Sequence, residues 1–125
     1  MADSNNVESG IDERSFRFAC EVIRFVRTIR YEPGMRRLIE QLVDASGSVG
    51  ANRDEATSGS SRKEFIRYNE ISLRSAKESV RWLRVCAETG LGSREKCLPL
   101  IDEGKQIANI LGAIVVRSKR NTLAP

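Results

Sequence analysis

The chain has 125 residues, enough for one domain that buries a hydrophobic core without disulfide or metal support. Apolar residues make up 40% and charged residues 30%, which excludes an intrinsically disordered chain. Lys and Arg outnumber Asp and Glu by 21 to 17, so the net charge is +4. That excess permits binding to nucleic acid or to another anionic surface without requiring it.

The three cysteines, Cys20, Cys86 and Cys97, are odd in number and lack C-x-x-C spacing. We therefore expect buried, reduced thiols. The first 14 residues are polar and acidic, unlike a signal peptide, and no apolar run approaches the ~20 residues of a membrane span. These features predict a cytoplasmic protein.

Residues 1–12 are polar and aperiodic, so we expect a flexible N-terminal tail. From Arg14 to Tyr31 apolar residues recur at helical spacing. Glu32-Pro33-Gly34 should end this first helix, because the residue before a proline is disfavoured in the helical region. Pro33 then suits the first turn of the second helix.

The second helix is rich in small residues over positions 45–52. Gly47 and Gly50 each cost roughly 1 kcal/mol relative to alanine in a helix interior. We expect that cost to be tolerated because the helix packs close to a neighbour. A phosphate-binding loop is excluded, since no strand precedes the segment and neither glycine-rich phosphate motif is present.

The third helix carries three distinct rows of side chains. Ser61 to Glu64 forms a capping box at its start, it runs to about Glu88, and Thr89 to Gly92 ends it. One row at three- and four-residue steps predicts a buried seam: Ile66, Asn69, Leu73, Ala76, Val80, Leu83 and Ala87. A second row is aromatic at its ends and small in the middle: Phe65, Tyr68, Ser72, Ser75, Ser79, Trp82 and Cys86. Asn69 needs a buried partner or a place at the bundle end, and we expect a hydrogen-bonded residue that sets helix register rather than a ligand site.

The fourth helix should open at Ser93 or Leu98, with Pro99 tolerated only in its first turn. Its last turns carry cations that complement the helix dipole, Arg117, Lys119 and Arg120, and residues 121–125 should fray. Four amphipathic helices joined by short loops predict an all-α fold, an antiparallel up-down-up-down four-helix bundle over residues 13–120.

An enzyme is not expected. The chain has no histidine, the commonest general base and transition-metal ligand, so the Glu-x-x-His pairs of diiron bundles cannot occur. Asp54, Glu55 and Glu64 cluster near one loop, where Asp54 and Glu55 are better interpreted as exposed acids at a helix end. We predict no catalytic residue, no cofactor and no metal site.

Three segments resemble one bacterial family. They are the runs from Ser46 to Ala56, Ser61 to Phe65 and Ser72 to Arg84. Matching positions are Ser48, Val49, Ala51, Asn52, Glu55, Lys63, Glu64, Phe65, Ala76, Glu78, Trp82 and Leu83. The sequence resembles the small four-helix-bundle proteins of intervening sequences in large-subunit ribosomal RNA genes, a fold group that includes the accessory variability proteins of diversity-generating retroelements. Arg53 stands where the family usually has an apolar residue, and Ala56 where it usually has glycine.

The resemblance implies a homopentameric barrel without known catalytic activity. For the retroelement branch it also implies a basic surface that binds nucleic acid and a reverse transcriptase. The chain independently favours self-assembly, because the seam and the second row together are wider than one bundle needs. We assign the second row, Phe65, Tyr68, Ser72, Ser75, Ser79 and Trp82, to oligomer packing.

The third row of the third helix is basic and carries the functional hypothesis. We predict a nucleic-acid-binding face made of Lys63, Arg67, Arg74, Lys77, Arg81, Arg84, Arg117, Lys119 and Arg120. Aromatic residues do not interleave with the cations, so contacts to the RNA or DNA backbone are expected rather than base stacking. One alternative is a solvated face with internal pairs such as Glu70–Arg74 and Glu78–Arg81. Another is a scaffold that docks a protein partner, such as a reverse transcriptase, without binding nucleic acid.

Overall fold

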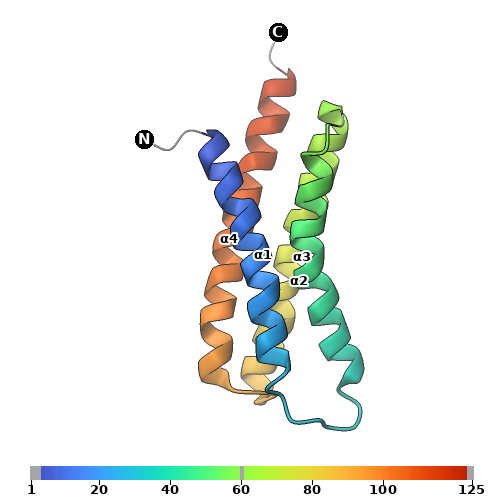
Figure 1. Cartoon of the computed structure of the whole chain (residues 1–125), viewed down its shortest axis with the longest axis vertical. Coiled ribbons are helices and arrows are strands. Elements are labelled where there is room, and N and C mark those ends of the chain that lie inside the picture. The colour runs from blue at the N-terminus through green and yellow to red at the C-terminus, as the bar shows by residue number, and fades with distance from the viewer. Residues whose placement is uncertain (1–3, 60, 124–125) are drawn as a thin grey trace.

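The computed structural model describes the backbone of residues 4–59 and 61–123 and the side chains of residues 10–59 and 61–121. Within these ranges the chain forms four helices and no strand: α1 (Ser4–Val26), α2 (Arg36–Ala56), α3 (Arg62–Thr89) and α4 (Arg94–Leu123). α1 and α3 each contact both α2 and α4, and the described residues show no diagonal packing (Figure 1). The predicted up-down-up-down four-helix bundle is confirmed.

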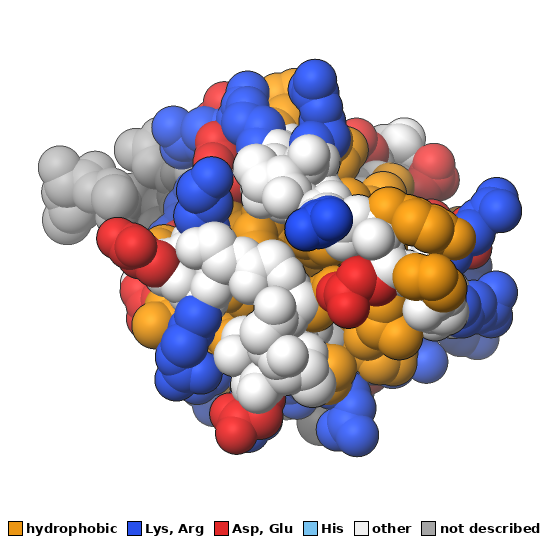
Figure 2. Space-filling view, turned by 90° about the horizontal axis from the view of Figure 1, so that it is seen from below, with side chains coloured by type: hydrophobic (Ala, Val, Ile, Leu, Met, Phe, Trp, Pro, Cys, Tyr) orange, Lys and Arg blue, Asp and Glu red, His pale blue; other side chains and the backbone are white. Residues whose placement is uncertain are grey.

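The lower end of the bundle carries the connections between α1 and α2 and between α3 and α4. Seen from this end, cations and carboxylates alternate around the rim (Figure 2). This end therefore presents no extended surface of a single charge. None of the described helices combines the length and the apolarity that crossing a bilayer requires.

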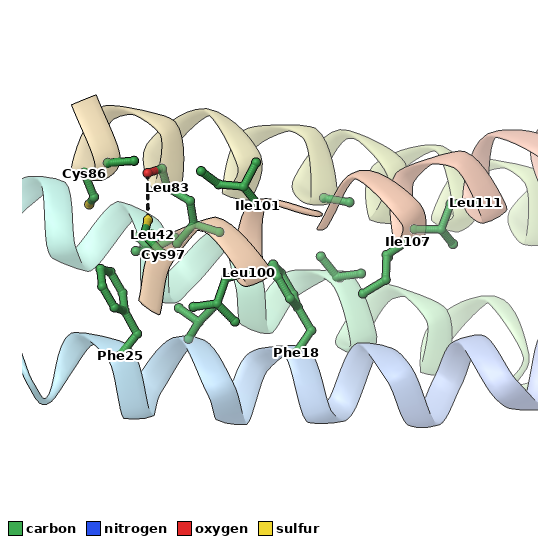
Figure 3. Packing of buried hydrophobic residues seen from close by; sticks show 14 of the residues in the cluster. Phe18, Phe25, Leu42, Leu83, Cys86, Cys97, Leu100, Ile101, Ile107 and Leu111 are labelled. Atoms are coloured by element: carbon green, nitrogen blue, oxygen red, sulfur yellow. Dashed lines mark hydrogen bonds between the residues drawn. The ribbon is translucent and has the colours of Figure 1, made fainter. Parts of the chain in front are cut away.

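The core extends along the bundle axis and receives side chains from all four helices. Phe18 and Val22 of α1, Leu42 of α2, Leu83 of α3 and Leu111 of α4 are all at most 1% exposed (Figure 3). Burying an aliphatic or aromatic side chain of this size contributes roughly 1.5–3 kcal/mol. The apolar face of each helix is therefore buried against the neighbouring helices.

A tight helix contact at a glycine lies at Gly104 of α4, whereas close packing was predicted at Gly47 and Gly50 of α2. A Cβ atom on Gly104 would lie 2.7 Å from Cγ2 of Val80, so only glycine fits there. A Cβ atom on Gly47 would meet nothing within 4 Å, and one on Gly50 would make ordinary contact with Ser15 at 3.6 Å. Gly47 is exposed on the outer face of α2, whereas larger residues such as Leu42 fill the buried inner face.

α1 begins at Ser4, well before the predicted boundary of the flexible tail at residue 12. Ile11 is 1% exposed and Asp12 forms an ion pair with Arg53 of α2, so tertiary contacts that the polar sequence did not predict hold this part of α1. The prediction was wrong for residues 4–12, and residues 1–3 lie outside the described residues. The helix also ends at Val26, five residues before the predicted end at Tyr31. Just after Val26, the amides of Thr28 and Ile29 donate hydrogen bonds to carbonyls three residues back, so the last turn is tighter than an α-helix.

The other helix ends match the sequence prediction in part. The Ser61 hydroxyl accepts a hydrogen bond from the Glu64 amide at 3.2 Å, and Gly90 ends α3 with a left-handed φ of 74°. Pro33, expected in the first turn of α2, lies before that helix, which begins at Arg36.

α4 opens at Ser93, one of the two predicted positions, but departs from the prediction at Pro99 and at its C-terminal end. Ser93 caps it, but Pro99 lies in the second turn rather than the first. Pro99 and Glu95 are exposed, so water can bond the carbonyl that proline leaves without a donor. α4 continues through residues 121–123, predicted to fray, while residues 124–125 lie outside the described residues.

Candidate nucleic-acid interface

The six predicted cations of α3 lie on one outer face of that helix. Lys63, Arg67, Arg74, Lys77, Arg81 and Arg84 are all exposed. With a rise of 1.5 Å per residue, the row from Lys63 to Arg84 is about 31 Å long. We call these six residues the α3 basic row.

The internal ion pairs expected for a merely solvated face do not form. The Glu70 carboxylate binds Lys119 of α4 at 2.9 Å, not Arg74, and the Glu78 carboxylate accepts a hydrogen bond from the Trp82 indole at 3.2 Å. Among the described residues, Arg74, Lys77, Arg81 and Arg84 make no ion pair, while Lys63 is exposed at the start of the row. The described residues therefore leave the positive charge of these four cations unneutralised.

Arg67 is the member of the row that has intramolecular partners. Its Nη2 lies 3.4 Å from the Glu64 carboxylate, and its guanidinium lies 4.7 Å from the centroid of the Tyr68 ring. The hydrogen bond to Glu64 raises the pKa of Arg67. Arg67 is thus held at the surface near the start of α3, in contrast to the unpaired cations further along the helix.

The structure brings one of the three predicted α4 cations to the row. Lys119 reaches α3 through its ion pair with Glu70. Arg117 and Arg120 are also exposed, but residues one or two positions apart do not share a helix face, so they point away from Lys119. The predicted nine-residue face is therefore one continuous row with Lys119 beside it and two cations elsewhere.

The serines assigned to oligomer packing are covered by α2 of the same chain. The Ser72 hydroxyl donates to the Val49 carbonyl at 2.7 Å, and the Ser75 hydroxyl donates to the Ser48 hydroxyl at 3.0 Å. Ser79 is fully buried and donates to the Ser75 carbonyl at 2.8 Å. The single bundle therefore already buries the small-residue middle of this row, because α3 packs between two neighbours. Phe65, Tyr68 and Trp82 are half-buried.

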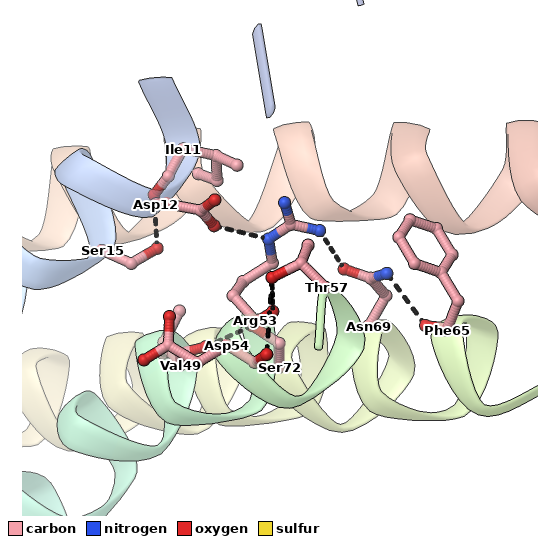
Figure 4. Close-up of polar contacts among 10 residues, drawn as sticks. All are labelled: Ile11, Asp12, Ser15, Val49, Arg53, Asp54, Thr57, Phe65, Asn69 and Ser72. Carbon is pink, nitrogen blue, oxygen red and sulfur yellow. Dashed lines mark hydrogen bonds and ion pairs between the residues drawn. The ribbon is translucent and has the colours of Figure 1, made fainter. Parts of the chain in front are cut away.

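Asn69 is part of a buried polar cluster that joins three helices. Arg53 of α2 is 0% exposed and donates from Nε to the Asp12 carboxylate and from Nη1 to the Asn69 side-chain oxygen, each at 2.8 Å (Figure 4). Asn69 in turn donates to the Phe65 carbonyl at 2.9 Å. The expectation that Asn69 is a buried, hydrogen-bonded residue is confirmed.

The role of Arg53 was missed from the sequence, where it was noted only as a departure from the family pattern. Two signals pointed to it: a charged residue on the inner face of α2, and a polar Asn69 in an otherwise apolar seam. Its Asp12 partner could not be found, since residues 1–12 were assigned to a tail. Within the part of the chain whose side chains are described, Arg53 Nη2 has no hydrogen-bond partner.

The remaining candidate groups do not assemble into a site. Asp54 and Glu55 are exposed near the end of α2, as predicted. Among the residues whose side chains are described, no three His, Cys, Asp or Glu residues lie close enough to hold a metal ion. Cys86 and Cys97 are buried, Cys20 is half-buried, and all three are free thiols. Burial raises the pKa of Cys86, and that of Cys97 to about 11, which keeps both protonated at neutral pH.

Comparison with known proteins decides the family. The sequence profile of the 23S rRNA-intervening sequence protein family matches residues 8–113. The chain belongs to this family. A crystal structure from Bacteroides thetaiotaomicron, described as a protein of unknown function from the S23 ribosomal protein family, has the same fold with a TM-score of 0.76. The two chains are 23% identical over 87% of this chain and 97% of that one. No curated protein sequence matches this member of the intervening-sequence family.

Proposed function

We propose that the chain is a non-catalytic protein that binds nucleic acid through the phosphate backbone. The observation that carries this proposal is the set of exposed cations on α3, Arg74, Lys77, Arg81 and Arg84, which have no ion pair among the described residues. Unpaired cations along a rigid helix offer phosphates a surface without breaking intramolecular contacts. The family description refers to 23S rRNA, which makes structured RNA the first ligand to test.

The chemistry of the row favours recognition of the backbone over recognition of bases. Arg and Lys bind phosphates by charge and hydrogen bonds, which carry no sequence information by themselves. Tyr68 contacts Arg67 at one end of the row, but the row itself contains no aromatic residue, so we expect no continuous platform for stacked bases. Binding should therefore depend steeply on salt and weakly on sequence.

We infer that the protein also self-assembles, in line with the homopentamer implied by the family resemblance. Supporting this inference, Phe16 and Ile23 on the outer face of α1 are 64% and 43% exposed and lie seven residues apart on one helix face. A ring would repeat the α3 basic row and so enlarge the basic surface. Light scattering at micromolar concentration tests the inference, and a monomer mass would contradict it.

Two cellular roles are open to such a protein in the cytoplasm, and the genes that surround its own gene distinguish them. A neighbouring reverse-transcriptase gene with template and variable repeats would favour a retroelement accessory factor that also binds the reverse transcriptase. Insertion of the gene within a 23S rRNA gene would favour the intervening-sequence role.

The direct test measures RNA and DNA binding across a salt series. A variant in which Arg74, Lys77, Arg81 and Arg84 are replaced by Gln should lose most of its affinity. Four phosphate contacts correspond to a slope of about −3 to −4 in a plot of log Kobs against log salt, and the variant should lose about that slope.

A matched control removes the same charge elsewhere. Arg27, Arg30, Arg37 and Lys96 are exposed cations near the lower end of the bundle, and replacing them by Gln also changes the net charge by four. This control should retain most of the salt slope. Equal losses in both variants, or no binding to RNA or DNA at low salt, would contradict the proposal.

A further inference from the structure

A hollowed surface with an apolar floor runs along α3 beside the α3 basic row, and two of its three hollows open between α3 and α4. Three successive hollows of about 500, 340 and 250 Å³ open along it, and they contain Ile66, Leu73 and Val80 of α3 respectively. Val115 and Ala108 of α4 line the second and third hollows. We call this feature the α3–α4 groove.

The three α3 side chains on the floor repeat at a regular distance. Ile66, Leu73 and Val80 are each seven residues apart and half-buried. Seven residues of helix correspond to about 10.5 Å, the spacing at which a second helix repeats its apolar side chains in heptad packing. The floor is thus suited to a helix whose apolar residues recur every seventh position.

The charges around the groove are nearly all positive. The residues lining the three hollows include six cations and one carboxylate: Arg62, Lys63, Arg67, Arg74, Lys77, Lys105 and Glu70. Glu70 is itself bound by Lys119. A ligand that complements this rim must carry several negative charges.

There is unfilled space on the α4 side of the groove. Gly112 follows Ala108 by four residues and precedes Val115 by three, so it lies on the same helix face. A Cβ atom on Gly112 would meet nothing within 4 Å. A side chain of an approaching helix can therefore enter beside Gly112.

We propose that the α3–α4 groove binds an amphipathic acidic helix of a partner protein. The partner places apolar residues, one per heptad, over Ile66, Leu73 and Val80, and its flanking Asp or Glu residues face the cationic rim. The groove shares Lys63, Arg67, Arg74 and Lys77 with the α3 basic row, and its apolar floor is the part that phosphate binding does not require. Arg81 and Arg84 belong to the basic row and not to the three hollows, which makes the two functions separable.

The probe is a fluorescein-labelled peptide of about three heptads with Leu on one helix face and Glu beside it. Its control has the same composition with the Leu residues scattered around the helix. Fluorescence anisotropy with the full chain should give a dissociation constant in the micromolar range for the amphipathic peptide and about tenfold weaker binding for the control. Equal binding of the two peptides would overturn the proposal, since charge alone would then explain it.

Two glycine substitutions locate the binding site without removing a core side chain. Gly112→Phe fills the groove and should weaken peptide binding at least about tenfold. Gly47→Phe is the matched control, because Gly47 also lies within a helix and faces open space, but on the outer face of α2. Thermal unfolding of both variants checks that the bundle is intact. Unchanged peptide binding by folded Gly112→Phe would overturn the proposal.

Two further measurements distinguish this proposal from the other functions. The affinity of Gly112→Phe for RNA should match that of the wild type at every salt concentration. This expectation does not depend on whether the Gln variant of the α3 basic row loses RNA binding. Loss of RNA binding in this variant alone would assign the groove to nucleic acid. A changed oligomer mass in Gly112→Phe would assign it to a second copy of this chain, and either result would overturn the partner-helix proposal.

Discussion

Polar groups on the side of α3 that faces α2 are hydrogen-bonded within the chain, whereas most cations on the side that faces solvent have no ion pair among the described residues. Towards α2, the hydroxyls of Ser72, Ser75 and Ser79 each have a hydrogen-bond partner inside the chain. On the solvent side, cations such as Arg74 and Arg81 have no ion pair among the described residues. The two sides belong to one helix with one regular backbone, so the difference lies in what each side contacts.

This comparison shows on which side of α3 the choice of residues is constrained by the stability of the fold. A buried polar group without a partner costs about 1–3 kcal/mol, whereas an exposed cation is solvated by water at little cost. The inner side must therefore be matched residue by residue to α2. The outer side can keep unpaired charge, and that freedom makes it available for a ligand. Three predictions test this contrast, in order of decreasing effect on the free energy of unfolding.

The largest effect is expected at the buried cluster on the inner side. Asp12→Ala leaves the fully buried Arg53 guanidinium without its carboxylate partner. Removing one member of a buried ion pair costs about 3–5 kcal/mol, and because Asp12 is 38% exposed we expect the lower end, about 3 kcal/mol. Chemical denaturation monitored by circular dichroism measures the change.

The double variant Asp12→Ala, Arg53→Met provides the control. It removes both charges together with Arg53 Nη2, which has no partner among the described side chains, and fills the site with an apolar chain of similar length. Replacing a buried ion pair by apolar residues is often neutral, but Arg53→Met also leaves the buried Asn69 side-chain oxygen without its donor, so we expect a stability between that of Asp12→Ala and that of the wild type. A double variant less stable than Asp12→Ala would show that the cluster stabilises the fold through more than charge pairing.

An intermediate effect is expected from enlarging a side chain between α3 and α2. Ser75 is 8% exposed and bonded to Ser48, so Ser75→Leu overpacks the contact and should cost about 2 kcal/mol. The adjacent Arg74→Leu changes the solvent side and should alter stability by less than about 0.5 kcal/mol. Thermal unfolding compares the two variants. Equal losses would remove the distinction between the two sides of α3.

The smallest effect concerns Cys97, whose thiol donates to the Leu83 carbonyl of α3 at 3.0 Å. Burial raises the pKa of Cys97 to about 11, above its value in the unfolded chain. The unfolded chain therefore releases this proton first as pH rises, and stability falls. The loss between pH 7 and pH 10 should be about 1.4 kcal/mol.

Cys97→Ala isolates this contribution from other groups that titrate in the same range. The variant should be less stable at pH 7, yet lose less stability than the wild type on the way to pH 10. Denaturation curves at both pH values give the difference. An identical pH dependence in both proteins would show that Cys97 ionises as readily in the folded state as in the unfolded chain.

Much of the fold could be predicted because the patterns that specify it are local. The Ser61 cap and the Gly90 stop depend on residues within one or two helical turns, and both were predicted. Of the predicted seam of α3, Asn69, Ala76, Leu83 and Ala87 are buried, whereas Ile66, Leu73 and Val80 are half-buried. The start of α1 was missed because burial of Ile11 depends on the other helices, and polar neighbours hide it in the sequence. The α3 basic row was recognised from its spacing, but its ion pairs were not. The Glu70 carboxylate forms its ion pair with Lys119 of α4 and not with Arg74 of its own helix.

The sequence by itself determined that four amphipathic helices form and that one of them displays a row of cations, because hydrophobic and charged periodicity is a property of a single helix. Only the tertiary structure decided which of those cations remain unpaired, that Arg53 is buried between Asp12 and Asn69, and that an apolar groove opens beside α3. These features arise where two or three helices meet. Each depends on the distance and rotation between helices, which no single helix encodes.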